Sequence, residues 1–99
     1  MTKDTQTIFD DICAHIQKQG SGFSSWYAGI TEDVKERLFV DHGVSEKNGW
    51  WIHRKAMSSN NARAIEKALL DSGCDGGGGG GDDDATHVYA YLKTANTDP

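Results

Sequence analysis

The sequence is poor in cysteine and contains no long apolar run. Its two cysteines, Cys13 and Cys74, lack the C-x-x-C spacing of a structural zinc site, so we expect reduced thiols and a cytoplasmic setting. No apolar run approaches the ~20 residues that a helix needs to cross a bilayer. The opening residues MTKDTQTIFDD also lack the basic-then-apolar pattern of a signal peptide. We therefore expect no membrane partner.

Positive charge is also scarce. Lys and Arg number 10 against 15 Asp and Glu, which gives a formal net charge of −5 at pH 7. This balance argues against broad, non-specific nucleic-acid binding, which needs several cations facing phosphates. The balance does not exclude a local basic patch, because several cations lie in the middle of the sequence: Lys35, Arg37, Arg54, Lys55, Arg63 and Lys67.

The chain length sets the number of domains. With 99 residues, of which 36% are hydrophobic, the chain can build one modest core, so we expect a single domain over residues 1–99. Within it, the run of glycines and aspartates at 76–84 predicts a flexible, solvated loop. Residues 94–99 predict a frayed tail.

Apolar residues recur at helical spacing in three segments. The first covers residues 5–19, and Gly20 follows where a C-terminal cap is expected. The second begins near Thr31 or Asp33 and ends near His42. The third follows the polar residues 58–61, which are good N-caps, and stops before Gly73. The buried stripes predicted for these helices are Ile8, Phe9, Ile12, Cys13 and Ile16; Val34 and Leu38; and Ala62, Ile65 and Leu69.

Three further segments are typical of strands, at residues 26–30, 50–56 and 87–93. The last alternates clearly, with Val88 and Ala90 on one face and Tyr89 and Tyr91 on the other. The element order is therefore α-β-α-β-α-β. This order predicts an α+β domain in which a small three-stranded sheet is flanked by three helices.

The stretch from Tyr27 to Leu38 carries a motif. It reads Tyr-x-Gly-Ile-Thr at residues 27–31, then Asp33, then Arg37-Leu38. This motif resembles the second half of the signature of the GIY-YIG nuclease family, in which a strand with Tyr-x-Gly leads into a helix bearing an arginine. The later segments WWIHRKA and ARAIEKALL are similar to the family's next strand and to the helix with its metal-binding glutamate. The resemblance covers roughly residues 26–70.

The resemblance implies a divalent-metal-dependent endonuclease that hydrolyses phosphodiesters in DNA or RNA. Glu66 would hold Mg²⁺ or Mn²⁺ through its carboxylate. Arg37 would stabilise charge that develops on the phosphate, and Tyr27 would activate or position a water nucleophile. His42 matches, with a displacement of one residue, a histidine that often follows this helix in the family.

Substrate contacts are implied at three further positions. Gly29 lacks a side chain and would let a phosphate approach the sheet closely. Lys35 and Arg63 would contact the nucleic acid as part of a basic rim around Arg37, to which Arg54 and Lys55 would also belong.

The first half of the signature is missing from its expected place. The family begins with a Gly-Ile-Tyr strand shortly before the second motif, where this chain has IQKQGSGF and no tyrosine. The C-terminal strand, VYAYLK, is a candidate replacement in a circularly permuted arrangement. Tyr89, or else Tyr91, would then stand beside Tyr27 as the missing tyrosine.

Each of these residues also has an ordinary structural interpretation. Arg37 lies four residues after Asp33, which is the spacing of a surface ion pair on a helix. Glu66 fits an ordinary solvated helix position, and Tyr27 fits a half-buried strand aromatic. Gly29 fits a bulge or a strand end before the helix.

Three classes of function therefore stay open. The first is a metal-dependent endonuclease. The second is a catalytically degenerate domain of the same type that binds nucleic acid or protein without cleaving. The third is an interaction domain, for example a homo-oligomer formed through an exposed sheet edge or through Trp50 and Trp51.

Overall fold

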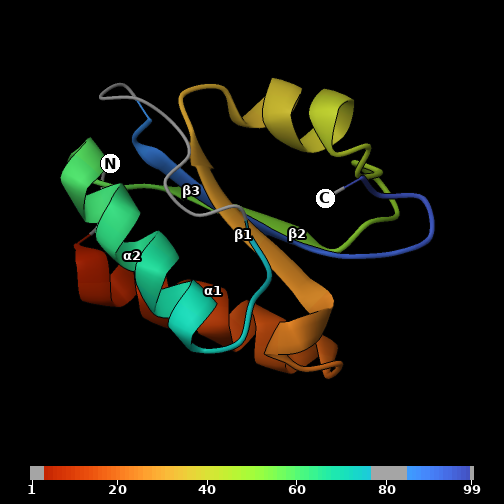
Figure 1. The fold of residues 1–99 in the computed structure, drawn as a ribbon, viewed down its shortest axis with the longest axis horizontal. Helices are drawn as coiled ribbons and strands as arrows, with labels where there is room; N and C mark the ends of the chain where they lie inside the picture. Colours follow the sequence, from red (N-terminus) through yellow and green to blue (C-terminus); the bar gives the residue numbers. More distant parts are fainter. Residues whose placement is uncertain (1–3, 77–84, 99) are drawn as a thin grey trace.

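A computed structural model describes residues 4–76 and 85–98. Within these ranges three strands form one antiparallel sheet in the order β1-β3-β2: β1 (Trp26–Thr31), β2 (Trp51–Lys55) and β3 (His87–Leu92). The C-terminal strand β3 is thus central and pairs directly with β1, as Figure 1 shows.

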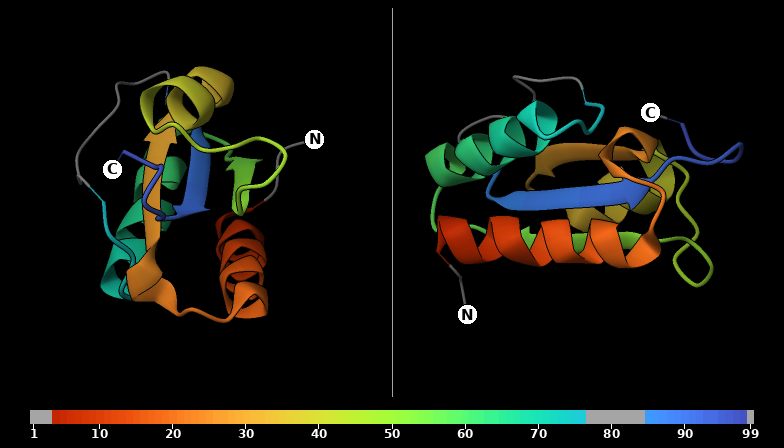
Figure 2. Two further views of the ribbon diagram at one scale, coloured as in Figure 1. Left: turned by 90° about the vertical axis from the view of Figure 1, so that its right-hand side faces the viewer. Right: turned by 90° about the horizontal axis from the view of Figure 1, so that it is seen from below.

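The helices cover the two faces of this sheet. Helices α1 (Thr5–Gln19) and α2 (Ser59–Asp71) lie on one face, and the shorter helix η2 (Glu36–Asp41) lies on the other (Figure 2). A single 3₁₀ turn, η1 (Phe23–Ser25), leads into β1. The predicted α+β class, with a small three-stranded sheet and three flanking helices, is confirmed for the described part of the chain.

Local capping explains where the two long helices begin and end. The Asp4 side chain accepts a hydrogen bond from the Thr7 backbone N–H at 2.7 Å, and the Ser58 hydroxyl accepts one from the Asn61 N–H at 3.1 Å. Gly20 ends α1 at φ 95°, a left-handed conformation that favours glycine, as the sequence predicts.

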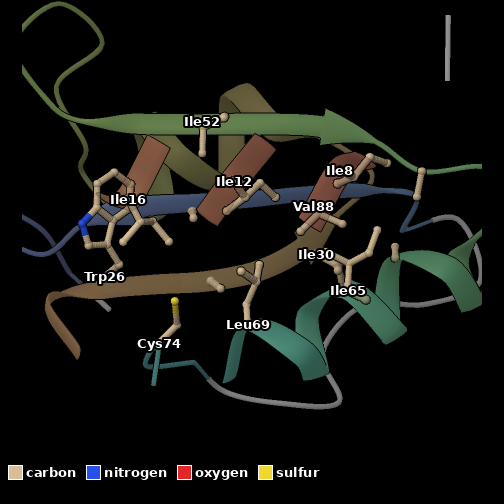
Figure 3. Packing of buried hydrophobic residues seen from close by; sticks show 14 of the residues in the cluster. Ile8, Ile12, Ile16, Trp26, Ile30, Ile52, Ile65, Leu69, Cys74 and Val88 are labelled. Carbon is tan, nitrogen blue, oxygen red and sulfur yellow. The ribbon is translucent and has the colours of Figure 1, made fainter. Parts of the chain in front are cut away.

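The main core lies between the sheet and the two long helices. The stripes predicted for α1 and α2 all point into it, together with the even-numbered face of β1 and β3 (Figure 3). Because β-strand side chains alternate, the odd-numbered residues of the same strands must face η2. The buried members of this core include Ile8, Ile12, Ile16, Trp26, Ala28, Ile30, Ile52, Ile65, Leu69, Val88 and Ala90.

Helix η2 differs from the expected α-helix in its hydrogen bonding. Asp33 caps the segment by accepting from the Glu36 N–H at 3.2 Å, but residues 36–41 form a π-helix. Its last bond runs from the His42 N–H to the Arg37 carbonyl at 3.0 Å, a span of five residues. The π-turn holds one residue more than an α-turn before the chain reaches His42.

The described residues of the expected tail, 94–98, make hydrogen bonds with the body of the domain and with one another. Backbone hydrogen bonds join Asp98 to His42 and Thr97 to Thr94, at 2.7 and 3.2 Å. The expected glycine- and aspartate-rich loop lies outside the described residues, apart from Gly76. In the ranges that are described, no helix is long and apolar enough to cross a bilayer.

The packing of η2 predicts a contrast between two of its side chains. Leu38 is 0% exposed and Val40 is 72% exposed. Leu38→Ala should lower the free energy of unfolding by about 2–5 kcal/mol, because it opens a cavity between η2 and the sheet. Val40→Ala, the matched control, should change it by less than about 0.5 kcal/mol. Urea unfolding measures both, and equal effects would contradict this packing.

Candidate functional site

The sheet face beneath η2 is aromatic. Tyr27 of β1 and Tyr91 of β3 stand opposite each other in the register, with ring centroids 5.4 Å apart. Gly29 stands opposite Tyr89 in the same way. This face is closed by a second apolar cluster in which Tyr89 and Tyr91 pack with Leu38 and Val44.

His42 is the centre of this aromatic group. The π-helical segment ends at this residue and holds the imidazole against the sheet, where it is only 6% exposed. Its Nε2 lies 2.8 Å from the Tyr89 hydroxyl. Its Nδ1 lies 2.8 Å from the Asp98 carbonyl oxygen and 3.1 Å from the Tyr91 hydroxyl. Its ring also lies over that of Tyr27, with centroids 4.9 Å apart.

The partners of His42 define its tautomer. A carbonyl oxygen only accepts hydrogen bonds, so Nδ1 must carry the proton that bonds to Asp98. In the neutral ring Nε2 is then an acceptor, and the Tyr89 hydroxyl donates its proton to it. The geometry therefore orients the Tyr89 O–H toward a basic nitrogen.

The space over Gly29 is filled by Tyr89. A Cβ built at Gly29 would lie 2.5 Å from the Tyr89 hydroxyl oxygen and 2.7 Å from the ring carbon that bears it. The expectation of an open notch for a phosphate above Gly29 is therefore corrected. The missing side chain makes room for the phenol, and this lets Tyr89 reach His42.

The pKa of the Tyr89 phenol depends on its burial and on the charges of several of the predicted site residues. Burial raises the pKa of the Tyr89 phenol well above its ordinary value, and the neighbouring Tyr27 and Glu66 raise it further. Arg37 acts on the same phenol in the opposite direction, because its positive charge favours the phenolate and lowers the pKa. Glu66 belongs to α2 and Arg37 to η2, which lie on opposite faces of the sheet, so the two charges act on this phenol from different sides.

Arg37 lies in acidic surroundings. Its guanidinium pairs with Asp41 at 3.5 Å, and not with Asp33, whose carboxylate caps η2. A hollow of about 210 Å³ beside it is lined by four carboxylates as well as by the arginine. The acidic side chains of this lining are Glu32, Asp33, Glu36 and Asp41.

Glu66 is a buried carboxyl group on α2 and not a solvated one. It is 5% exposed, and this burial raises the pKa of its carboxyl group, an effect that the nearby Arg63 opposes. In residues 4–76 and 85–98 no group of three or more His, Cys, Asp or Glu side chains is arranged to hold a metal ion.

The cations predicted to form a basic rim do not all gather around Arg37. Lys35 is exposed and lines a different hollow, together with Phe39 and Trp51. Arg54 pairs with Asp11 of α1 at 3.3 Å, so its charge is directed to the opposite side of the sheet. Of the expected cations, Arg37 acts on the Tyr89 phenol and Arg63 acts on Glu66.

Sequence reasoning missed the part played by the C-terminal segment. The Asp98 carbonyl belongs to the backbone, so no side-chain pattern marks it. His42 itself was among the residues that the resemblance indicated, by its place directly after the second helix. A comparison of the chain with protein-family models, with curated proteins and with solved structures finds no match in any of the three.

The contact between Gly29 and Tyr89 predicts a coupling between the two positions. Gly29→Ala should cost about 1–3 kcal/mol of unfolding free energy, because the added methyl group displaces the phenol. In a Tyr89→Phe background the cost should be smaller, since the nearest clashing atom is gone. A double-mutant cycle by urea denaturation measures this. The same cost in both backgrounds would contradict the observed contact.

Burial of the phenols predicts a loss of stability in alkali. Burial raises the pKa of both Tyr89 and Tyr91 in the folded state, above the ~10 of an unfolded tyrosine. The stabilisation that this provides is complete below about pH 10 and is lost as the pH rises further. We expect Tyr89→Phe to make the fall in unfolding free energy between about pH 10 and pH 12 shallower. An unchanged slope would contradict the burial of this phenol.

Proposed function

We propose that the chain is a divalent-metal-dependent phosphodiester hydrolase, a GIY-YIG-like nuclease domain in which the C-terminal strand replaces the missing first strand. The observation that carries the proposal is the Tyr89 hydroxyl, which lies on Gly29 and donates to His42 Nε2 at 2.8 Å. Two further observations support it. Strand β3 lies directly against the strand with the Tyr-x-Gly motif, and the charges of Arg37 and Glu66 shift the pKa of this hydroxyl in opposite directions.

The proposed chemistry uses Tyr89 and His42 as a proton relay. Tyr89 Oη accepts a proton from the attacking water as its own proton passes to His42 Nε2. The water oxygen then forms a bond to phosphorus, and the bond from phosphorus to the leaving oxygen breaks. Arg37 stabilises the negative charge that develops on the phosphate oxygens. The leaving oxygen takes its proton from solvent.

Glu66 is the residue that would hold a divalent cation. Mg²⁺ binds proteins through one or two carboxylates and completes its shell with water and substrate phosphate, so a single carboxylate fits it. The burial of Glu66, which raises the pKa of its carboxyl group, is the kind of cost that a bound cation offsets. When bound, Mg²⁺ or Mn²⁺ would polarise the phosphate.

A second candidate function is a domain of the same type that binds nucleic acid or protein without cleaving. The observations that favour it are the negative charge beside Arg37 and the burial of Tyr89 and His42. Four carboxylates line the hollow beside Arg37, and Tyr89 and His42 are 3% and 6% exposed. Burial restricts access to the relay, which argues against cleavage. Carboxylates repel a phosphate backbone, so they favour a protein partner over nucleic acid.

The proposed setting is a reducing one, as in the cytoplasm. Cys13 and Cys74 are both free thiols. Burial raises the pKa of the Cys74 thiol to about 11, with a smaller contribution from Cys13. A thiol that stays protonated is a poor nucleophile, so Cys74 acts as a core residue in this proposal.

The experiment that tests the proposal is cleavage of labelled DNA and RNA with Mg²⁺ or Mn²⁺. Arg37→Ala should lower kcat by about 10²–10³-fold, through loss of charge stabilisation. Glu66→Gln and Tyr89→Phe should also abolish most of the metal-dependent activity. Lys67→Ala is the control on α2, because Lys67 is exposed and pairs with Asp71 away from the site.

The alternatives separate on the outcome. Metal-dependent cleavage that these three variants abolish and Lys67→Ala retains would support the hydrolase. No cleavage by the unmodified chain, with salt-dependent binding in the absence of metal, would favour the non-cleaving binding domain. Neither cleavage nor binding of nucleic acid would overturn the hydrolase and leave only the protein-binding form of the second candidate.

A further inference from the structure

The C-terminal segment 94–98 returns across the domain and meets His42. Figure 1 shows it turning back after β3 toward the segment that follows η2. Two hydrogen bonds join Asp98 to His42. The Asp98 N–H donates to the His42 carbonyl at 2.7 Å, and His42 Nδ1 donates to the Asp98 carbonyl at 2.8 Å.

The segment is held in this place by its own turn. The Thr97 hydroxyl oxygen accepts from the Thr94 N–H at 2.9 Å, and the Thr97 N–H donates to the Thr94 carbonyl at 3.2 Å. Gly43 follows His42 at φ +67°, and a Cβ built there would lie 3.3 Å from the Asn96 carbonyl oxygen. The backbones on both sides therefore fit closely, and Asp98 is not a loosely placed end.

The Asp98 carbonyl decides which nitrogen of His42 carries the proton. Without it, Nδ1 would face only the Tyr91 hydroxyl at 3.1 Å, and a hydroxyl donates as readily as it accepts. The opposite tautomer would then satisfy every group equally well. Tyr91 would donate to Nδ1, and the Nε2–H would donate to Tyr89. In that state Nε2 carries a proton and cannot accept the one on Tyr89.

We propose that residues 94–98 are a positioning segment whose Asp98 carbonyl holds His42 in the Nδ1–H tautomer. The segment acts on the tyrosine through the imidazole and touches no substrate. Its effect on the tautomer is a property of the fold. Its effect on catalysis rests on the proposed hydrolase function.

The test is the protonation state of His42 in ¹⁵N-labelled protein, read from the couplings of the two ring nitrogens to the carbon-bound ring protons. In the full chain Nδ1–H should dominate. Truncation after Thr97 removes the Asp98 carbonyl and keeps the Thr94–Thr97 turn. It should shift the tautomer ratio toward Nε2–H by about 2- to 10-fold, the equilibrium change expected for one net hydrogen bond.

Asp98→Asn is the matched control, because it changes the side chain and keeps the backbone carbonyl. It should leave the tautomer ratio at the value of the full chain. A truncated chain that keeps the full-length ratio would overturn the proposal, and so would an equal shift in Asp98→Asn. Truncation after Lys93 is the stronger variant. The shorter truncation decides the question if that variant does not fold.

Activity provides a second readout that separates the two proposals. If the full chain cleaves, truncation after Thr97 should lower kcat in proportion to the loss of the Nδ1–H tautomer, by up to about fivefold, and leave KM nearly unchanged, because the proton acceptor is lost and no binding group is. If the full chain does not cleave, the proposed function fails, and the tautomer ratio still tests the positioning segment. Cleavage with an unchanged kcat after truncation would overturn the catalytic part of this inference.

Discussion

The structure of the η2 face depends on one hydrogen bond, from the Tyr89 hydroxyl to His42 Nε2. It is a buried bond between two polar groups, and each would be costly to bury alone. Three elements far apart in the sequence must meet to make it: β1 provides the space at Gly29, β3 provides the phenol, and the end of η2 provides the imidazole. The second apolar cluster, around Leu38 and Val44, closes over the same groups.

The same bond explains why the charged residues matter. In a buried, water-poor site a single charge shifts the ionisation of a phenol far more than it would in solvent. Burial raises the pKa of Tyr89 most, and the charges of Arg37 and Glu66 shift this pKa in opposite directions. The proposed hydrolysis would pass a proton through this hydroxyl. The carboxylates beside Arg37 show why substrate binding would need a cation to offset their charge.

Most of the fold could be predicted from the sequence, because it depends on local periodicity. The first helix was predicted at residues 5–19 and is observed there, and each strand lies within two residues of its predicted bounds. The π-helical bonding of η2 could not be predicted, because it depends on how Leu38 and His42 pack on the sheet. The anchoring of Asp98 could not be predicted either, because its contacts use backbone atoms. The filling of the Gly29 notch by Tyr89 follows from strand register, which a single sequence does not determine.

The most direct test of the nuclease account is a crystal structure of the chain with Mn²⁺ and a non-hydrolysable dinucleotide, with the metal located by its anomalous scattering. The account predicts Mn²⁺ on the Glu66 carboxylate, a phosphate against the Arg37 guanidinium and a water molecule within hydrogen-bond distance of Tyr89 Oη. Density for the metal or the phosphate at another place on the surface, with Glu66 and Tyr89 still enclosed by protein, would contradict it.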